Sequence, residues 1–174
     1  MRLPAGVRKL SDRQVIFLHI PKAGGSTLRT ILQRQYRERG VYEIRDDING
    51  DILRFCAGSE AERAATGLLM GHMGFGLHHF LPGPSVYLTM LRQPEKRVLS
   101  EFRFLQSNPY HVLHDAAKDL SLMQYLQSEM TGQISNGQTR LLCGATKDGQ
   151  TGIPTRRRME ERDLQQALHN MEAY

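Results

Sequence analysis

Long apolar segments are missing from this chain of 174 residues. No run approaches the roughly 20 apolar residues of a membrane-spanning helix, so the sequence predicts no span. The first residues, Met1 to Arg13, are polar and basic and lack the apolar centre of a signal peptide. We therefore expect a cytoplasmic protein. Its length is typical of one domain, here 1–174, with a flexible start at 1–13.

Cysteine and aromatic residues are also scarce. The two cysteines, Cys56 and Cys143, are far apart in the sequence and fit no metal or redox spacing, which predicts two reduced thiols. The net charge of +5 and the pI near 9.5 suit anionic partners such as nucleotides or acidic glycans. The basic residues are scattered, however, and aromatic residues make up only 7% of the chain, so we expect no nucleic-acid partner. The one basic run, 156–158, is interpreted as a solvated loop, with an acidic-glycan contact as the alternative.

Short apolar runs alternate with helical patterns along the chain. Buried strands are predicted at Val15–Ile20, Gly67–Gly71 and Val86–Leu91. Helices are predicted at Gly24–Arg39, Pro94–Gln106, Leu120–Met130 and Met159–Ala173. Weaker patterns predict a short strand at Ile52–Phe55, a short helix at Ser59–Ala65 with Ser59 as its cap, a loop at His72–Pro84 and a linker at Gly144–Pro154. Strands that alternate with helices indicate an α/β fold, a parallel sheet flanked by helices.

A glycine-rich turn joins the first strand to its helix. Residues Ile20–Thr27 read I-P-K-A-G-G-S-T. Such a turn collects backbone N–H groups and the positive end of a helix dipole at one point, which binds phosphate or sulfate. The lysine precedes the glycines, unlike in the P-loop of nucleoside triphosphatases, and no clear acidic strand end is present to hold Mg²⁺. The turn therefore disfavours triphosphate hydrolysis, and we expect no metal.

Four segments together resemble one known family. Residues 19–27 resemble the 5′-phosphosulfate loop of the sulfotransferases that include the heparan-sulfate 2-O- and 6-O-sulfotransferases, whose bacterial relatives often carry H-I-P-K-T-G-G-T there. Ala23 stands where threonine is common. Residues 91–102 are similar to the family's 3′-phosphate motif, L-R-D/N-P-x-x-R-x-x-S-x-F/Y, with Gln93 at the D/N position. Residues 71–76 and 136–144 resemble a G-H segment and an N-x-Q-T-R-x-L-x-G segment, and all four follow the family order.

This resemblance implies a P-loop-like sulfotransferase fold. It also implies transfer of a sulfuryl group from 3′-phosphoadenosine 5′-phosphosulfate to a hydroxyl acceptor, here a carbohydrate, with an acidic glycan as one option. The residues implied in donor binding are Lys22, Ala23, Gly24, Gly25, Ser26, Thr27, Arg92 and Ser100. Relatives continue beyond the closing helix with another strand and further helices, so we expect the C-terminal part of the family fold to be missing.

Two residues are predicted to take part directly in the chemistry. Lys22 would neutralise charge on the leaving phosphate, and His72 would act as general base, because an imidazole titrates near neutral pH. His78 and His79 are the competing candidates for the base. His19, inside a predicted strand, is interpreted as a core histidine.

Other charged and polar residues of the motifs have simpler interpretations. Arg97 and Glu101 are four apart on a predicted helix and suggest a solvated ion pair. Gln138 and Arg140 are candidates to line the donor or acceptor cleft. The alternative functions are a nucleotide-binding protein of the same fold without transfer activity, truncated or intact, and a small kinase-like phosphotransferase.

Overall fold

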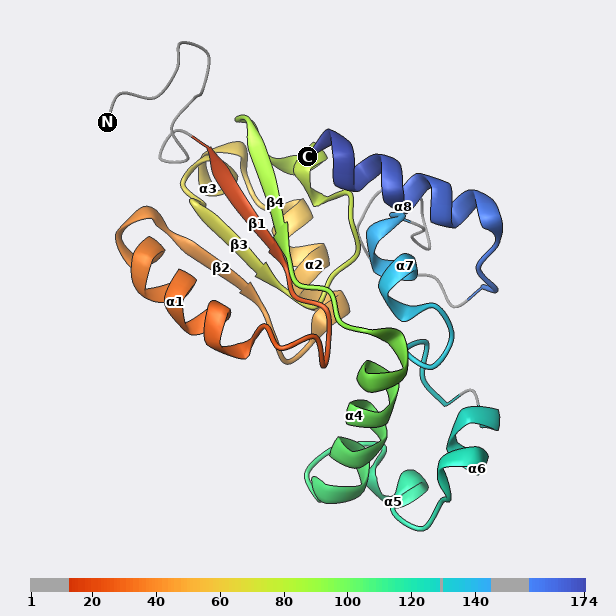
Figure 1. Ribbon diagram of the computed structural model, residues 1–174. Coiled ribbons are helices and arrows are strands. Elements are labelled where there is room, and N and C mark those ends of the chain that lie inside the picture. Colours follow the sequence, from red (N-terminus) through yellow and green to blue (C-terminus); the bar gives the residue numbers. More distant parts are fainter. Residues whose placement is uncertain (1–12, 129, 145–156) are drawn as a thin grey trace, which may run out of the picture.

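A parallel sheet forms the centre of the molecule (Figure 1). The structure, a computed structural model, describes residues 13–128, 130–144 and 157–174, so most of the predicted flexible start and of the predicted linker lie outside it. The strands are β1 (Gln14–Leu18), β2 (Val41–Ile44), β3 (Leu68–Gly71) and β4 (Ser85–Thr89), in the order β2-β3-β1-β4. All neighbours pair in parallel, and Val15 of β1 lies opposite Leu68 of β3 and Val86 of β4. The predicted α/β fold class is confirmed.

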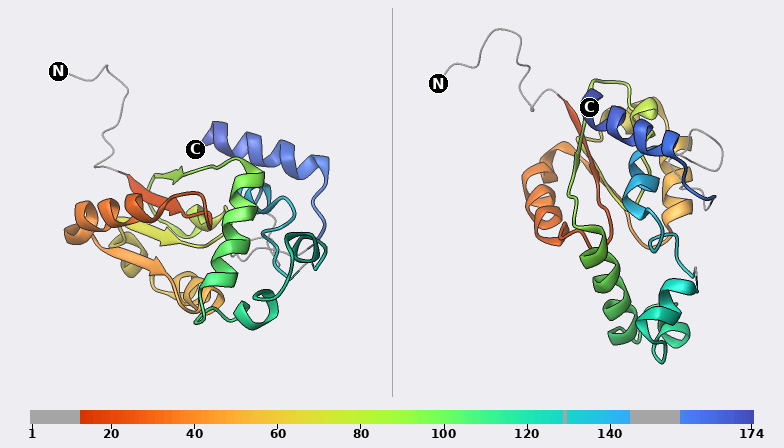
Figure 2. Two further views of the ribbon diagram at one scale, coloured as in Figure 1. Left: turned by 60° about the horizontal axis from the view of Figure 1, so that its bottom comes forward. Right: turned by 45° about the vertical axis from the view of Figure 1, so that its right-hand side comes forward.

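Helices cover both faces of this sheet and extend beyond one of its ends. They are α1 (Ser26–Tyr36), η2 (Arg37–Arg39), α2 (Ile48–Ala57), α3 (Glu60–Ala64), η3 (Leu77–Phe80), α4 (Pro94–Ser107), α5 (His114–Ala117), α6 (Leu122–Gln127), α7 (Gly137–Leu142) and α8 (Glu161–Ala173). Figure 2 shows α1 on one side of the sheet and α2, α7 and α8 on the other. No helix in the described ranges has both the length and the apolar character to cross a bilayer.

The alternation of apolar residues in β1 explains these two layers. Val15 and Phe17 point to one face and pack with Leu28 of α1. Ile16 and Leu18 point to the other face and join the larger core under α2, α7 and α8. Because successive side chains of a strand point to opposite faces of the sheet, a continuous apolar run such as Val15–Leu18 must be covered on both faces. The central place of β1 follows directly from its sequence.

Helix α4 leaves the carboxyl end of β4 and extends away from the sheet with α5 and α6 (Figures 1 and 2). Phe102, Leu105, Ala117 and Tyr125 form a separate small core among these helices. Pro94 lies in the first turn of α4, as predicted, where its missing N–H costs nothing. The carboxyl edge of the sheet is thus bordered by the start of α4.

The segment between the first two predicted strands differs from expectation. The predicted strand Ile52–Phe55 is part of helix α2, which Asp47 caps by accepting a hydrogen bond from the Gly50 N–H. Ile52 and Phe55 are both buried, and their spacing of three places them on one face of a helix. A strand that the sequence did not predict, β2, precedes this helix. The predicted helix 59–65 and its Ser59 cap are confirmed.

Three helical segments differ in detail. The predicted helix Leu120–Met130 is shorter, and α6 begins after a capping box at Ser121. The segment Gln138–Cys143, for which no structure was predicted, forms α7. In α1, Ile31 is half exposed, and Leu28, Leu32 and Tyr36 are the side chains that pack on the sheet.

Candidate active site

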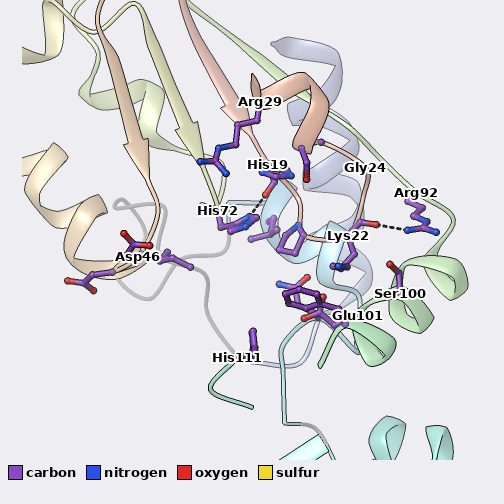
Figure 3. A pocket seen from close by; sticks show the side chains of 18 of the residues that line it. His19, Lys22, Gly24, Arg29, Asp46, His72, Arg92, Ser100, Glu101 and His111 are labelled. Carbon is purple, nitrogen blue, oxygen red and sulfur yellow. Dashed lines mark hydrogen bonds between the residues drawn. The ribbon is translucent and has the colours of Figure 1, made fainter. Parts of the chain in front are cut away.

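A cavity of about 1260 Å³ opens at the carboxyl edge of the sheet and joins the two predicted phosphate motifs (Figure 3). Ligands of open α/β sheets bind at this edge. The predicted site residues that line it are Lys22, Gly24, Gly25, Ser26, His72, Arg92 and Ser100. They come from three separate segments: the β1–α1 loop, the end of β3, and the β4–α4 connection with α4.

The β1–α1 loop presents the start of α1 to this cavity. Lys22 and Gly24 have positive φ values of 61° and 90°, which turn the chain sharply from the strand into the helix. Gly25 is the N-cap of α1, no side chain caps the helix, and its first turn holds no acidic residue. The first N–H groups of a helix have no intrahelical partner. Together with the helix dipole, they form a site for an anion.

Close packing requires glycine at position 25. A Cβ atom there would lie 2.5 Å from Cδ2 of His19. The His19 ring cannot easily retreat, because it stacks on Phe17 with ring centroids 5.2 Å apart and packs in a tilted contact against His72 with centroids 4.8 Å apart. The loop and the two histidines therefore form one packed unit.

Two predicted loop residues do not line the cavity. The Ala23 side chain is buried in the core, and its N–H donates to the Ile20 carbonyl at 3.3 Å. This environment suits the small apolar side chain that replaces the family's threonine. Thr27 is exposed in the first turn of α1, outside the cavity.

Lys22 and Arg92 connect the two motifs. The Arg92 guanidinium donates from Nη1 to the Lys22 carbonyl at 3.0 Å, across 70 residues of sequence. The Lys22 ammonium lies 3.9 Å from the ring centroid of Phe104, a cation–π contact. Phe104 is one helical turn beyond Ser100 on α4, so both face the cavity.

The hydrogen bond of His72 determines its tautomer. Its Nδ1 lies 2.6 Å from the His19 carbonyl oxygen, as Figure 3 shows. A carbonyl oxygen only accepts, so Nδ1 carries the proton. The other ring nitrogen, Nε2, then holds a lone pair and has no hydrogen-bond partner in the part of the chain that is described. In the neutral ring, Nε2 is therefore the nitrogen that can accept a proton.

His19 is not the core histidine that the sequence suggested. It follows β1, is half-buried and lines the cavity. Burial, with smaller contributions from the neighbouring His72 and Arg29, lowers the pKa of His19 from 6.5 to about 4. A neutral His19 adds no repulsive charge beside His72.

The other candidate bases lie elsewhere. His78 and His79 are in η3 and do not line the cavity. The Nδ1 atom of His78 lies 3.1 Å from the Tyr87 hydroxyl, and burial lowers the pKa of His78 to about 4 while it raises that of Tyr87 to about 12. Of the three candidate bases, the structure brings only His72 to the phosphate motifs.

The predicted solvated ion pair of Arg97 and Glu101 is wrong, because both side chains are buried, at 2% and 8% exposure. Arg97 donates from Nη1 to the side-chain oxygen of Gln133 at 2.9 Å, and it also bonds the Gln133 carbonyl. Burial lowers the pKa of Arg97. Glu101 lines the cavity, and within the described ranges no hydrogen bond or ion pair reaches its carboxylate.

The cavity also contains residues that sequence reasoning missed. They are His19, Pro21, Arg29, Asp46, Asp47, Ile48, Asn49, Glu101, Phe104, His111, Gln133 and Leu141. Helical spacing from Ser26 and Ser100 was a usable signal for Arg29 and Phe104. The loop before α2 gave no such signal, because it meets the cavity only through tertiary structure. No group of three or more His, Cys, Asp or Glu side chains suited to a metal ion occurs among the residues described.

The remaining predicted polar residues serve the fold around this cavity. Gln138 and Arg140 do not line it. Arg140 is buried and donates to the Arg157 carbonyl at 2.6 Å. Arg157 in turn forms a two-pronged ion pair with Asp163, whose pKa this arginine lowers to about 2. Arg156 lies outside the described residues, and Arg158 is exposed.

Comparison with protein families gives a match to the Sulfotransferase family over residues 10–165. The match covers most of the chain and contains all four motifs and the cavity. The chain belongs to the sulfotransferase family. The resemblance on which the predictions rest is confirmed, and the general chemistry of this sulfotransferase is sulfuryl transfer from a sulfate donor to a hydroxyl acceptor. Searches of curated proteins and of solved structures returned no match.

Proposed function

We propose that this sulfotransferase transfers the sulfuryl group of 3′-phosphoadenosine 5′-phosphosulfate to a carbohydrate hydroxyl, with His72 as general base. One observation carries the proposal. The start of α1 and the pair Arg92 and Ser100, which both suit an anion, face one cavity that also holds His72 with its Nδ1 bonded to a carbonyl and its Nε2 open. A donor with phosphates at both its 5′ and 3′ positions requires two such elements.

The residues present fit this donor. The uncapped first turn of α1, with Ser26, suits the 5′-phosphosulfate. Arg92 and Ser100 suit the 3′-phosphate, since a guanidinium offers a planar set of donors and a serine adds a hydroxyl. When bound, the donor supplies an activated sulfuryl group and a stable leaving phosphate.

The chain's own groups would handle the proton and the charge. His72 accepts the proton of the acceptor hydroxyl at Nε2 while the hydroxyl oxygen forms its bond to sulfur. The bond from sulfur to the 5′-phosphate oxygen breaks in line, and its electron pair stays on that oxygen. Lys22 and the start of α1 stabilise this charge. The products are a sulfate ester, adenosine 3′,5′-bisphosphate and a protonated His72, which returns its proton to solvent.

The lining of the cavity suits a sugar. Asp46, Asn49 and His111 add hydrogen-bonding groups to the lining, and Figure 3 shows Asp46 and His111 away from Lys22 and Arg92. The carboxylates of Asp46 and Glu101 favour an uncharged carbohydrate over the acidic glycan that the net charge alone suggested, because like charges repel. Transfer to neutral oligosaccharides should therefore exceed transfer to uronate-bearing ones of the same length, and the reverse order would restore the acidic glycan.

Transfer of radiolabelled sulfate from the donor to an oligosaccharide mixture tests the reaction. His72→Ala should lower the rate by about 10²–10⁴-fold and leave binding of adenosine 3′,5′-bisphosphate largely unchanged. His79→Ala is the matched control, since this histidine is exposed and outside the cavity. Full transfer by His72→Ala would exclude His72 as the base. Tight binding of the bisphosphate by a wild-type protein without transfer would favour the nucleotide-binding alternative.

A further inference from the structure

The side chain of Gln138 is bound to the backbone of Arg92 in two places. Its amide nitrogen donates to the Arg92 carbonyl at 2.8 Å, and its oxygen accepts from the Arg92 N–H at 3.0 Å. The two residues are 46 positions apart in the sequence. A primary amide pairs with the N–H and the C=O of one residue only when both backbone groups point to the same side of the chain, so the contact fixes the orientation of Arg92 as well as its distance.

The backbone held by Gln138 has little other support. Arg92 lies in the connection between β4 and α4, and residues 90–96 are exposed. Both backbone polar groups of Arg92 are used by Gln138, while its guanidinium reaches the Lys22 carbonyl. Gln138 therefore fixes the backbone position from which the Arg92 side chain extends.

Helix α7, which carries Gln138, is held in place by contacts with three other parts of the fold. Gly137 is buried against Arg97, where a Cβ atom would lie 2.8 Å from Nη2 of that arginine. The Leu141 carbonyl accepts from the Phe75 N–H at 2.7 Å, and the Leu142 carbonyl accepts from the buried Asn170 side chain of α8 at 2.8 Å. The helix is thus attached to α4, to the loop after β3 and to α8 at once.

We propose that Gln138 is a positioning residue for the 3′-phosphate: it holds the Arg92 backbone so that the guanidinium serves the 3′-phosphate and the Lys22 loop together. This inference rests on the proposed function, because it concerns the second phosphate of the donor. Gln138 acts through Arg92 and touches no ligand.

Because the Arg92 backbone is exposed to solvent, nucleotide binding is a more informative measurement for Gln138 than stability. Water replaces the two hydrogen bonds when they are lost, so their net contribution to stability is small. Water does not, however, hold the Arg92 backbone in a fixed position. A change at Gln138 should therefore appear in the recognition of the 3′-phosphate more than in the free energy of unfolding.

Calorimetric titration with two nucleotides separates these effects. Adenosine 3′,5′-bisphosphate and 5′-AMP differ only in the 3′-phosphate, so the ratio of their affinities measures its recognition. Gln138→Met keeps the side-chain volume and removes both hydrogen bonds, and it should lower this ratio roughly tenfold with the 5′-AMP affinity unchanged. Gln106→Met is the matched control, because Gln106 also donates to backbone carbonyls, of Ala117, Lys118 and Leu120, but does not line the cavity or contact Arg92. It should leave the ratio unchanged.

A double-mutant cycle tests that Gln138 acts through Arg92. On an Arg92→Ala background, Gln138→Met should not weaken bisphosphate binding further. An unchanged ratio in Gln138→Met, an equal loss for both nucleotides, or an undiminished effect without Arg92 would each overturn the inference. If the methionine variant does not fold, Gln138→Asn, whose shorter amide cannot make both bonds, carries the same expectation, and loss of folding in both variants would also overturn it. A wild-type ratio near one would instead refute the 3′-phosphate assignment of the proposed function.

Discussion

Replacement of Gly25 by alanine should damage both the fold and the reaction, for a reason that the structure specifies. The new Cβ would lie 2.5 Å from Cδ2 and 2.7 Å from Nε2 of His19, and 3.0 Å from Cζ of Phe17. Carbon atoms in contact are about 3.5–4.0 Å apart, so the His19 ring must move by roughly 1 Å. Phe17 stacks on that ring, His72 packs against it at a tilt, and both oppose the movement.

Forced overpacking of this kind costs about 1–3 kcal/mol of unfolding free energy. The movement also reaches the proposed base, because the His19 carbonyl holds Nδ1 of His72. A displacement of about 1 Å in a reacting group can lower a rate about 10²-fold. We expect Gly25→Ala to lower the urea midpoint and to reduce sulfate transfer by about that factor.

Two other glycines provide controls. Gly83→Ala meets only the flexible Gln14 side chain, with Oε1 at 3.3 Å, and should change neither property much. Gly24→Ala has open space, with Cε of Met90 at 4.0 Å, so its cost of about 1–2 kcal/mol comes from the positive φ alone. If Gly25→Ala unfolds at the wild-type urea concentration and transfers sulfate at the wild-type rate, the packing argument is refuted.

Three further outcomes follow from buried groups. The pKa of His19 is lowered from 6.5 to about 4, and that of His78 likewise, so between these pH values the unfolded chain binds protons that the folded chain does not. The free energy of unfolding should therefore fall as the pH falls through this window. In urea titrations at pH 7 and pH 4.5, His19→Phe should remove about 1–2 kcal/mol of that fall. This figure is discounted because the His19 ring is only half-buried. Arg97→Met leaves the polar partners of a buried guanidinium unsatisfied and should cost about 2–4 kcal/mol by the same assay, whereas a solvated arginine would cost almost nothing. Gly71→Ala should lower the thermal midpoint strongly, by about 3 kcal/mol or more in free energy, since its Cβ would lie 2.1 Å from the Ile44 carbonyl oxygen at a φ of 143°; an unchanged midpoint would contradict this.

That Lys22, His72 and Arg92 share one edge of the sheet was easier to predict from the sequence than the elements between the motifs. Lys22, Arg92 and His72 meet because each follows a parallel strand of one sheet, and parallel strands place their carboxyl ends at a common edge. Topology therefore brings together whatever residues follow the strands. A buried strand is visible in a sequence because successive positions are apolar, as in Val15–Leu18 of β1 and in β3.

The segment with β2 and α2 was misassigned because its structure depends on tertiary contacts more than on local sequence. Strand β2 is short, lies at the edge of the sheet and has one fully buried position, Ile44, so it carries little hydrophobic signal. Its Glu43 is paired with Arg29 of α1, a contact that only the folded chain creates. In α2, the local run around Ile52 resembles a strand, and the helix is chosen by its cap and by the tertiary burial of Ile52 and Phe55 together.

In the proposed function, the Arg92 side chain donates hydrogen bonds in two directions, and this requires an arginine at position 92. Its Nη1 is directed at the Lys22 carbonyl, and its side chain lines the cavity where Ser100 also faces. A guanidinium has five N–H donors in a fixed plane, so one edge can hold the Lys22 loop while another binds a phosphate. An ammonium is a single point of charge and cannot keep both partners at fixed angles. In the proposed function, recognition of the 3′-phosphate and the shape of the 5′-phosphosulfate loop would therefore be coupled through this one side chain, and lysine would not be a conservative replacement there.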